Sequence, residues 1–316
     1  MFSVRKDKGF WLRLGGTLLT LALMVLLLRD QGWQEISGAF QRISIWRLAA
    51  AMLLMLLSRV AISFRWHVLL RTADEPVSLG QSLRLTFAGL FASNFLPTTI
   101  GGDVVRLAGA VQLRMDAAVS TASLVADRLV GMAGMTIALP WGLLRVAQVG
   151  LPALMAPSSG LPVLLAGITL VGWPRRLWDK LLQFVRKTLA NFALWARRPR
   201  ALGMALFFTG VHMLCFFSCI WILLDGMKEP IGWLRVAGIW SLIYFITLVP
   251  ISINGYGLQE VSTTLLYSRL GGISTEAGVT IALLVRTCQM VASLPGAFFV
   301  PGILAAQRDK PAAQQT

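Results

Sequence analysis

Long runs of apolar residues alternate with short charged stretches along most of this 316-residue chain. A helix needs about 20 consecutive apolar residues to cross a bilayer, and about six runs reach that length. They cover residues 10–28, 48–70, 117–144, 151–171, 201–224 and 277–301, each to within a few positions. Two shorter apolar runs, 79–96 and 233–249, end where prolines and glycines interrupt the pattern. The pattern predicts an all-α integral membrane protein.

The two interruptions share one arrangement of residues. The first, Asn94–Arg106, reads NFLPTTIGGDVVR, and the second, Val249–Glu260, reads VPISINGYGLQE. Each joins a proline to a pair of glycines and then to a carboxylate. Irregular backbone at membrane depth is tolerated only inside protein or beside a water-filled cavity. We therefore expect two broken, re-entrant helical hairpins in addition to the full spans.

The positions of the basic residues predict the orientation of the chain. The N-terminus carries Arg5, Lys6 and Lys8, and residues 173–200 are strongly basic, so both should be cytoplasmic. The helices between them must then alternate, so the first hairpin enters from the cytoplasm and the second from outside. The two repeats, about 48–144 and 201–305, are expected to be inverted, with hairpin tips that meet near the midplane. A parallel repeat with two fully crossing hairpins is the alternative.

Residues 173–200 form a segment of a different kind. It contains many basic residues and a single acid, Asp179, while apolar residues recur at helical spacing. The pattern favours an amphipathic helix on the cytoplasmic leaflet, and a plain positively charged loop is an equal alternative. The polar tail, 306–316, should be disordered and cytoplasmic. Residues 1–316 are thus interpreted as one polytopic domain of a bacterial cytoplasmic (inner) membrane.

Composition excludes several other classes of protein. The chain is 56% hydrophobic and 14% charged, whereas a soluble domain carries about 25% charged residues. Its net charge of +15 lies mostly between apolar runs, which favours contact with anionic lipid over nucleic acid. Neither histidine has a cysteine or carboxylate at ligand spacing, and Cys215 and Cys219 lack further ligands. We expect no metal site and no cofactor.

Ionisable residues within the apolar part of the chain are the candidates for chemistry, because burying them in a membrane is costly. Asp103 and Arg106 follow Gly101 and Gly102 at a helix start, where free N–H groups and an arginine could hold an anion. A local ion pair between positions i and i+3 that caps the helix is the alternative.

Two other charged residues, Asp127 and Arg128, are adjacent in mid-helix and so cannot face each other. They need partners elsewhere in the chain. Asp103 and Glu260 are the candidate partners of Arg128 and Arg286, and the sequence does not decide the pairing.

The predicted substrate-binding residues combine these charges with the residues of the two breaks. They are Asn94, Gly101, Gly102, Asp103, Arg106, Asp127, Arg128, Asn254, Gly255, Gly257, Glu260 and Arg286. Purely structural ion pairing is the alternative for the charged members, and the two asparagines could simply satisfy free backbone carbonyls. Arg59 and Arg65 are instead expected to snorkel toward the cytoplasmic surface, and a position that lines the interior is the alternative.

At these residues the chain resembles a known family. The resemblance rests on Asn-x-x-Pro-x-x-x-Gly-Gly-Asp-x-x-Arg at 94–106, Asp127-Arg128, Pro-x-x-x-x-Gly-x-Gly-x-x-Glu at 250–260, and Arg286. It covers nearly the whole chain and is to the lysylphosphatidylglycerol synthase transmembrane, or flippase-like, family. In the two-part multiple peptide resistance factor, such a domain moves aminoacylated phosphatidylglycerol between leaflets. The chain as given ends at Thr316, and we expect it to lack the soluble synthase domain.

The resemblance implies a lipid flippase or transporter that is not an enzyme. Its substrate would be an anionic or aminoacylated phospholipid or a polyprenyl-phosphate-linked lipid, held in a charged pocket near the midplane. An integral membrane glycosyltransferase or other lipid-modifying enzyme is one alternative, with Asp30 or Glu35 as candidate acids. A scaffold for a lipid synthase is another. Expected partners are membrane lipids, with a separate synthase and further copies of the chain as options.

Overall fold

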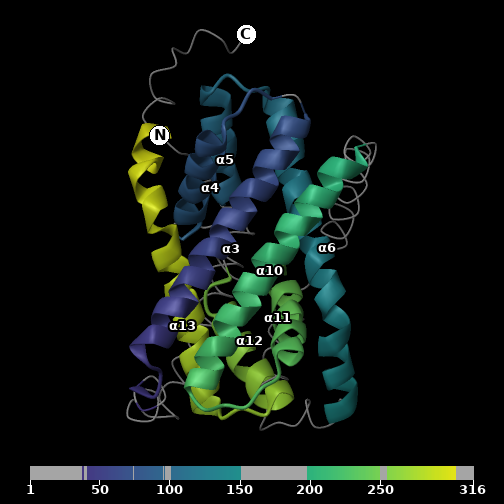
Figure 1. The fold of residues 1–316 in the computed structure, drawn as a ribbon, viewed down its shortest axis with the longest axis vertical. Coiled ribbons are helices and arrows are strands. Elements are labelled where there is room, and N and C mark those ends of the chain that lie inside the picture. The colour runs from purple at the N-terminus through teal and green to yellow at the C-terminus, as the bar shows by residue number, and fades with distance from the viewer. Residues whose placement is uncertain are drawn as a thin grey trace, which may run out of the picture. The chain divides into compact units, whose positions relative to one another are not determined.

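The computed structural model describes residues 38, 41–73, 75–94, 96, 101–150, 198–249 and 255–303. Several expected features lie outside these residues. They are the helices predicted at 10–28 and 151–171, nearly all of the amphipathic segment 173–200, and the tail 306–316. Within the described ranges every regular element is helical (Figure 1).

Four helices among the described residues are long and apolar enough to cross a membrane. They are α3 (Ile45–Thr72), α6 (Ala117–Val149), α10 (Pro199–Gly226) and α13 (Thr275–Ser293), the last continued by the 3₁₀-helix η4 (Leu294–Phe298). Each coincides with one of the expected spans. The prediction of a multi-pass membrane protein is thus confirmed for this part of the chain.

Shorter helices flank each predicted break. In the first half these are α4 (Leu79–Ser93) and α5 (Gly101–Gln112), and in the second half α11 (Trp233–Thr247) and α12 (Leu258–Leu266). A capping box between Ser78 and Gln81 fixes the start of α4. A π-helix, η3 (Tyr267–Gly271), directly continues α12.

The chain divides into two compact units, and within the described residues the boundaries fall inside the four long helices, after Leu54, Gly134, Cys215 and Cys288. The first unit contains α11, α12 and η3 with one part of each long helix. The second contains α4, α5 and η4 with the remaining parts. The chain therefore enters the second unit along α3, forms α4 and α5, and leaves along α6. It enters the first unit along α10, forms α11 and α12, and leaves along α13.

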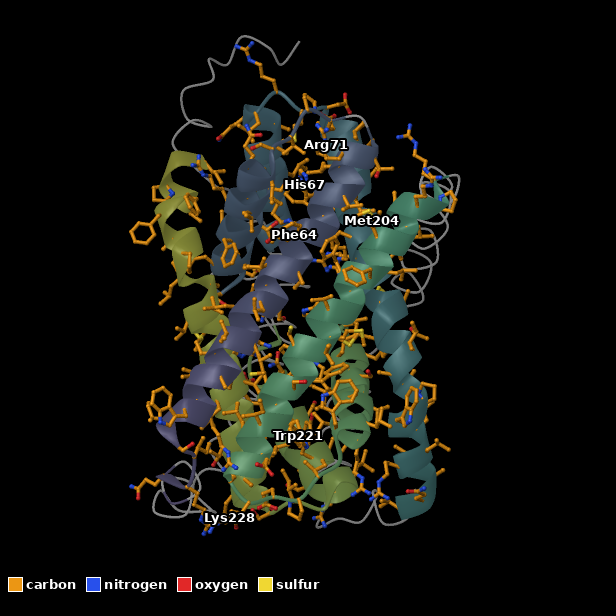
Figure 2. All side chains as sticks on the ribbon, viewed as in Figure 1. Phe64, His67, Arg71, Met204, Trp221 and Lys228 are labelled. Carbon is orange, nitrogen blue, oxygen red and sulfur yellow. The ribbon has the colours of Figure 1, made fainter. Side chains whose placement is uncertain are left out.

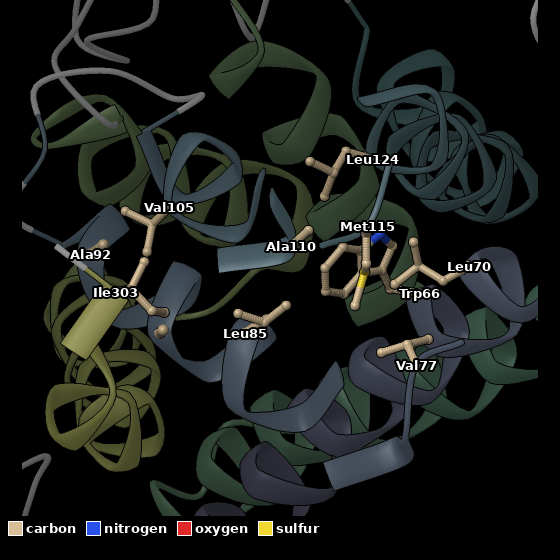
Figure 3. Close-up of a cluster of buried hydrophobic side chains, with 11 residues drawn as sticks. Trp66, Leu70, Val77, Leu85, Ala92, Val105, Ala110, Met115, Leu124 and Ile303 are labelled. Carbon is tan, nitrogen blue, oxygen red and sulfur yellow. The ribbon is translucent and has the colours of Figure 1, made fainter. Parts of the chain in front are cut away.

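The second unit is held together by a cluster of buried apolar side chains (Figure 3). Trp66 of α3, Leu85 of α4 and Val105 of α5 all contribute to it. Gly102 allows α5 to approach α4 closely, because a Cβ atom there would lie 2.5 Å from the carbonyl oxygen of Gly89. Small residues permit such close helix crossings inside membranes.

The part of α3 in the second unit contacts two of its neighbours through side chains that follow one another along the helix (Figure 2). Phe64 stacks on Phe208 of α10 with ring centroids 5.2 Å apart. One turn later, Nδ1 of His67 lies 3.0 Å from Oγ of Ser82 on α4, within hydrogen-bonding distance. These contacts anchor α3 in the second unit.

The first unit is built around α11. The hydroxyl of Tyr267 donates to the carbonyl oxygen of Val236 at 3.1 Å, and Trp240 packs against Phe216 with ring centroids 4.8 Å apart. Where α11 crosses α6, Gly238 and Gly142 bring the two backbones together, since a Cβ atom on either glycine would collide with the other helix. This crossing holds the C-terminal half of α6 against α11.

Candidate functional site

Asp127 lies at the centre of a buried group of charges in the second unit. Its Oδ1 atom accepts from Nε of Arg65 at 2.7 Å, and its Oδ2 atom accepts from Nη1 of Arg106 at 3.2 Å. The three side chains come from α6, α3 and α5 and are 4%, 8% and 8% exposed. Two guanidinium groups thus compensate one carboxylate that has almost no contact with solvent.

A second carboxylate extends this group. Asp103 sits in the first turn of α5, and its Oδ1 atom accepts from Nη1 of Arg106 at 3.2 Å. Its Oδ2 atom accepts from Nε of Arg128 at 2.5 Å. We call Arg65, Asp103, Arg106, Asp127 and Arg128 the first charge network. Asp127 and Arg128 have different partners, as their adjacency on a helix requires.

The network contains three arginines and two carboxylates, so it carries one excess positive charge. One of the three arginines faces an aromatic ring. The guanidinium carbon of Arg106 lies 4.1 Å from the ring centroid of Trp66, a cation–π distance. Trp66 is held in place because its indole N–H donates to Oγ of Ser123 at 3.0 Å. Arg128, with 40% of its side chain exposed, is the accessible arginine of the network.

The first unit contains a simpler charge pair. Glu260, in the first turn of α12, accepts from Nε of Arg286 at 2.5 Å through its Oε1 atom. Their side chains are 5% and 13% exposed. Nη2 of Arg286 donates to the carbonyl oxygen of Gly255 at 3.4 Å, and its guanidinium lies 4.7 Å from the ring of Tyr256. We call Glu260 and Arg286 the second ion pair.

The two clusters follow one local plan. In each, a carboxylate lies in the first turn of a short helix that follows a break, and it pairs with an arginine on the next long helix. The paired residues are 25 positions apart in the first cluster and 26 in the second. The predicted correspondence between Asp103 and Glu260 therefore extends to their partners.

The clusters differ in charge. At the positions that correspond to Arg106 and Asp127, the second half carries Thr263 and Val285. Both are buried. The Oε2 atom of Glu260 is buried and has no hydrogen-bond partner among the described residues. The second ion pair consists of one arginine and one carboxylate, so it is neutral. Its Oε2 atom can accept a further hydrogen bond.

Backbone geometry explains several of the predicted glycines. Gly255 and Gly257 adopt φ angles of 72° and 75°, a region in which residues with a Cβ atom are strained. Gly257 directly precedes α12 and so places Glu260 in the first turn of that helix. Gly101 and Gly102 are buried at the start of α5.

Of the two predicted asparagines, the structure describes Asn94. Asn94 caps the C-terminus of α4, and its side-chain amide donates to Oγ of Ser293 at 2.8 Å. Asn254 lies outside the described residues. The structure thus gives Asn94 a partner at the end of α13 and leaves the role of Asn254 a prediction.

The prediction that Arg65 snorkels is wrong. Its side chain is buried and bonds to Asp127, and its Nη1 atom also donates to Oγ1 of Thr209 at 3.3 Å. Sequence reasoning also missed the aromatic partners Trp66 and Tyr256. A signal was available for Arg65, because the mid-helix carboxylate Asp127 required a cation from another apolar run. Among the described residues no group of three metal-binding side chains occurs.

Comparison with known proteins adds one finding to this geometry. A family model described as the lysylphosphatidylglycerol synthase TM region matches residues 13–296. The matched range includes both breaks, the first charge network and the second ion pair. A search of curated proteins finds no match.

Proposed function

The chain belongs to the family of lysylphosphatidylglycerol synthase TM regions, and from this premise we propose that it moves an anionic lipid between membrane leaflets. Membership of this family supports a lipid-related role in the membrane. The proposed substrate class comprises anionic or aminoacylated phospholipids and polyprenyl-phosphate-linked lipids. The protein acts as a transporter and does not change the lipid covalently.

One observation carries the proposal: each broken helix pair contributes a carboxylate that pairs with an arginine of a long apolar helix. A charge inside a membrane is costly and usually lines the path of a polar substrate. A headgroup that crosses the bilayer needs polar surface along its route, while its hydrocarbon chains can stay in the lipid. The paired charges provide such a surface in otherwise apolar helices.

The chemistry of these residues fits a lipid phosphate. A guanidinium binds a phosphate through two parallel hydrogen bonds, which a carboxylate can also accept. Asp103 and Glu260 therefore hold Arg128 and Arg286 in the absence of lipid, and a phosphate replaces them during transfer. The accessible side chain of Arg128 makes it the first contact, and the Oε2 atom of Glu260, to which no described residue donates, suits an ammonium or hydroxyl donor.

The path of the chain supports re-entrant hairpins. The helices α4 and α5 lie wholly within the unit that α3 enters and α6 leaves, and α11 and α12 repeat this in the other unit. From the basic residues of the N-terminus and of 173–200 we further propose that the first hairpin enters from the cytoplasm and the second from the outside of a bacterial inner membrane. Both chain termini are then cytoplasmic.

Reconstituted leaflet exchange tests the proposal. Purified protein is placed in liposomes with fluorescent phosphatidylglycerol, aminoacylated phosphatidylglycerol, a polyprenyl phosphate or phosphatidylcholine, and the outer-leaflet probe is followed over time. The proposal predicts protein-dependent exchange of at least one anionic or aminoacylated lipid and little exchange of phosphatidylcholine. Absence of exchange for every lipid contradicts it. A covalently altered lipid in the same liposomes would favour the enzyme alternative.

A further inference from the structure

A groove of about 450 Å³ lies in the first unit, where the last turns of α6 meet the start of α11. Its lining includes Trp141, Leu144 and Arg145 of α6 and Trp233, Leu234 and Arg235 of α11. Arg145 lies about five helical turns beyond Asp127 along α6, so the groove is separate from the first charge network. None of its lining residues belongs to either charge cluster.

The groove combines an apolar wall with two cations. Leu144 and Leu234 are 59% and 50% exposed, and Trp141 is 41% exposed. Arg145 and Arg235 add two positive charges, and the described residues that line the groove include no carboxylate to offset them. The occupant that complements this surface has one anionic end and one long hydrocarbon end.

The guanidinium groups of the two arginines differ in their hydrogen bonds. Nε and Nη2 of Arg145 donate to the carbonyl oxygen of Leu270 at 3.2 and 3.1 Å, and Nη1 donates to Oε1 of Gln148 at 2.6 Å. Its guanidinium is therefore held in a fixed orientation and keeps further N–H groups for a ligand. The guanidinium of Arg235 has no hydrogen-bond or ion-pair partner in the part of the chain that the structure describes.

The groove lies at the ends of two apolar helices. Arg145 is in the last two turns of the apolar helix α6, and Arg235 is in the first turn of α11. Arginines and tryptophans at the ends of apolar helices lie at the boundary between hydrocarbon and water. The N-terminus of α11 adds to the positive potential, because Gly232 provides no side-chain cap for its N–H groups.

We propose that this groove binds an anionic lipid of the surrounding membrane. Arg145 and Arg235 hold its phosphate, and its acyl chains lie along Trp141, Leu144 and Leu234. This site binds lipid whether or not the protein moves lipid between leaflets, so its test is a binding measurement. A failure here leaves the proposed transport untouched, and a failure of transport leaves this site untouched.

The test uses the full chain, purified in detergent, with phosphatidylglycerol or phosphatidylcholine added, and native mass spectrometry counts the lipids retained. Wild-type protein should retain phosphatidylglycerol in preference to phosphatidylcholine. Arg235→Gln should reduce that preference about fivefold, the effect of one basic residue near an anionic lipid surface. Arg235→Lys should keep most of it, because the charge remains.

Arg200→Gln is the matched control, since it removes one exposed arginine at the start of α10, outside the groove. Arg235 carries the test because Arg145→Gln would also free the carbonyl of Leu270 and could disturb η3. Equal retention of the two lipids by the wild type, or an equal loss in Arg200→Gln, overturns the proposal. Displacement of bound phosphatidylglycerol by inorganic phosphate alone overturns the assignment to a membrane lipid.

Discussion

The Nε atom of Arg128 lies 2.5 Å from the Oδ2 atom of Asp103, although the two residues are 25 positions apart on different helices. Arg286 and Glu260 repeat the relationship in the other unit, at the same distance. In both halves the carboxylate in the first turn of the short helix after the predicted break therefore meets an arginine of the next long helix. The proposed transfer of lipid depends on these two pairs.

Replacing Asp127 with Asn should destabilise the protein strongly. The carboxylate compensates Arg65 and Arg106, and all three side chains are less than one-tenth exposed. Removing one partner of a buried ion pair leaves an uncompensated charge, which typically costs about 3–5 kcal/mol. Thermal unfolding in detergent, followed by intrinsic fluorescence, measures the effect.

The matched control for Asp127→Asn is Asp225→Asn. Asp225 pairs with Arg47 at 2.9 Å, but the two side chains are 53% and 43% exposed. Exposed ion pairs contribute about 0–1 kcal/mol, so this variant should unfold close to the wild-type temperature. Equal losses in the two variants would contradict the burial that the structure gives to Asp127.

Two glycine substitutions on neighbouring helices should have very different effects. Gly102→Ala should disrupt the packing of α5 on α4, because the new Cβ atom would meet the backbone of Gly89. Gly80→Ala, at an exposed position of α4 with nothing within 4 Å of the new Cβ atom, should be neutral or slightly stabilising. The unfolding temperatures of the two variants check the prediction, and a Gly102→Ala protein as stable as wild type would contradict it.

The ring of Trp66 should matter more than its indole N–H. Trp66→Phe keeps an aromatic face for Arg106 but loses the bond to Ser123 and part of the buried ring volume, whereas Trp66→Leu loses the aromatic face as well. A desolvated cation–π contact contributes about 2 kcal/mol, so the leucine variant should unfold at the lower temperature. A leucine variant at least as stable as the phenylalanine variant would exclude a role for the ring.

The sequence predicts the long helices well, because about 20 apolar residues without a break leave few alternatives in a membrane. The ends of α4 and α11 are equally predictable, since each helix ends within a few residues of the predicted break. The correspondence of Asp103 with Glu260 follows from the spacing of residues after each break.

The partners of the charges were not predictable to the same degree. Arg65 looks like a residue that snorkels, because it lies near the end of its apolar run, yet the packing of α3 against α6 turns it onto Asp127. The choice between Asp103 and Glu260 for Arg128 depends on how each short helix returns toward the next span. That path is set by contacts such as the approach of Gly89 and Gly102, which no local pattern encodes.

Leaflet exchange in liposomes that contain Arg128→Gln or Arg286→Gln tests the central claim most directly. Loss of a charge-assisted hydrogen bond costs about 1.5–3 kcal/mol, so each variant should exchange the anionic substrate about tenfold more slowly or worse. Arg47→Gln, which removes an exposed arginine outside both charge clusters, should exchange at the wild-type rate. Folded Arg128→Gln and Arg286→Gln proteins that exchange lipid as fast as wild type would contradict the account.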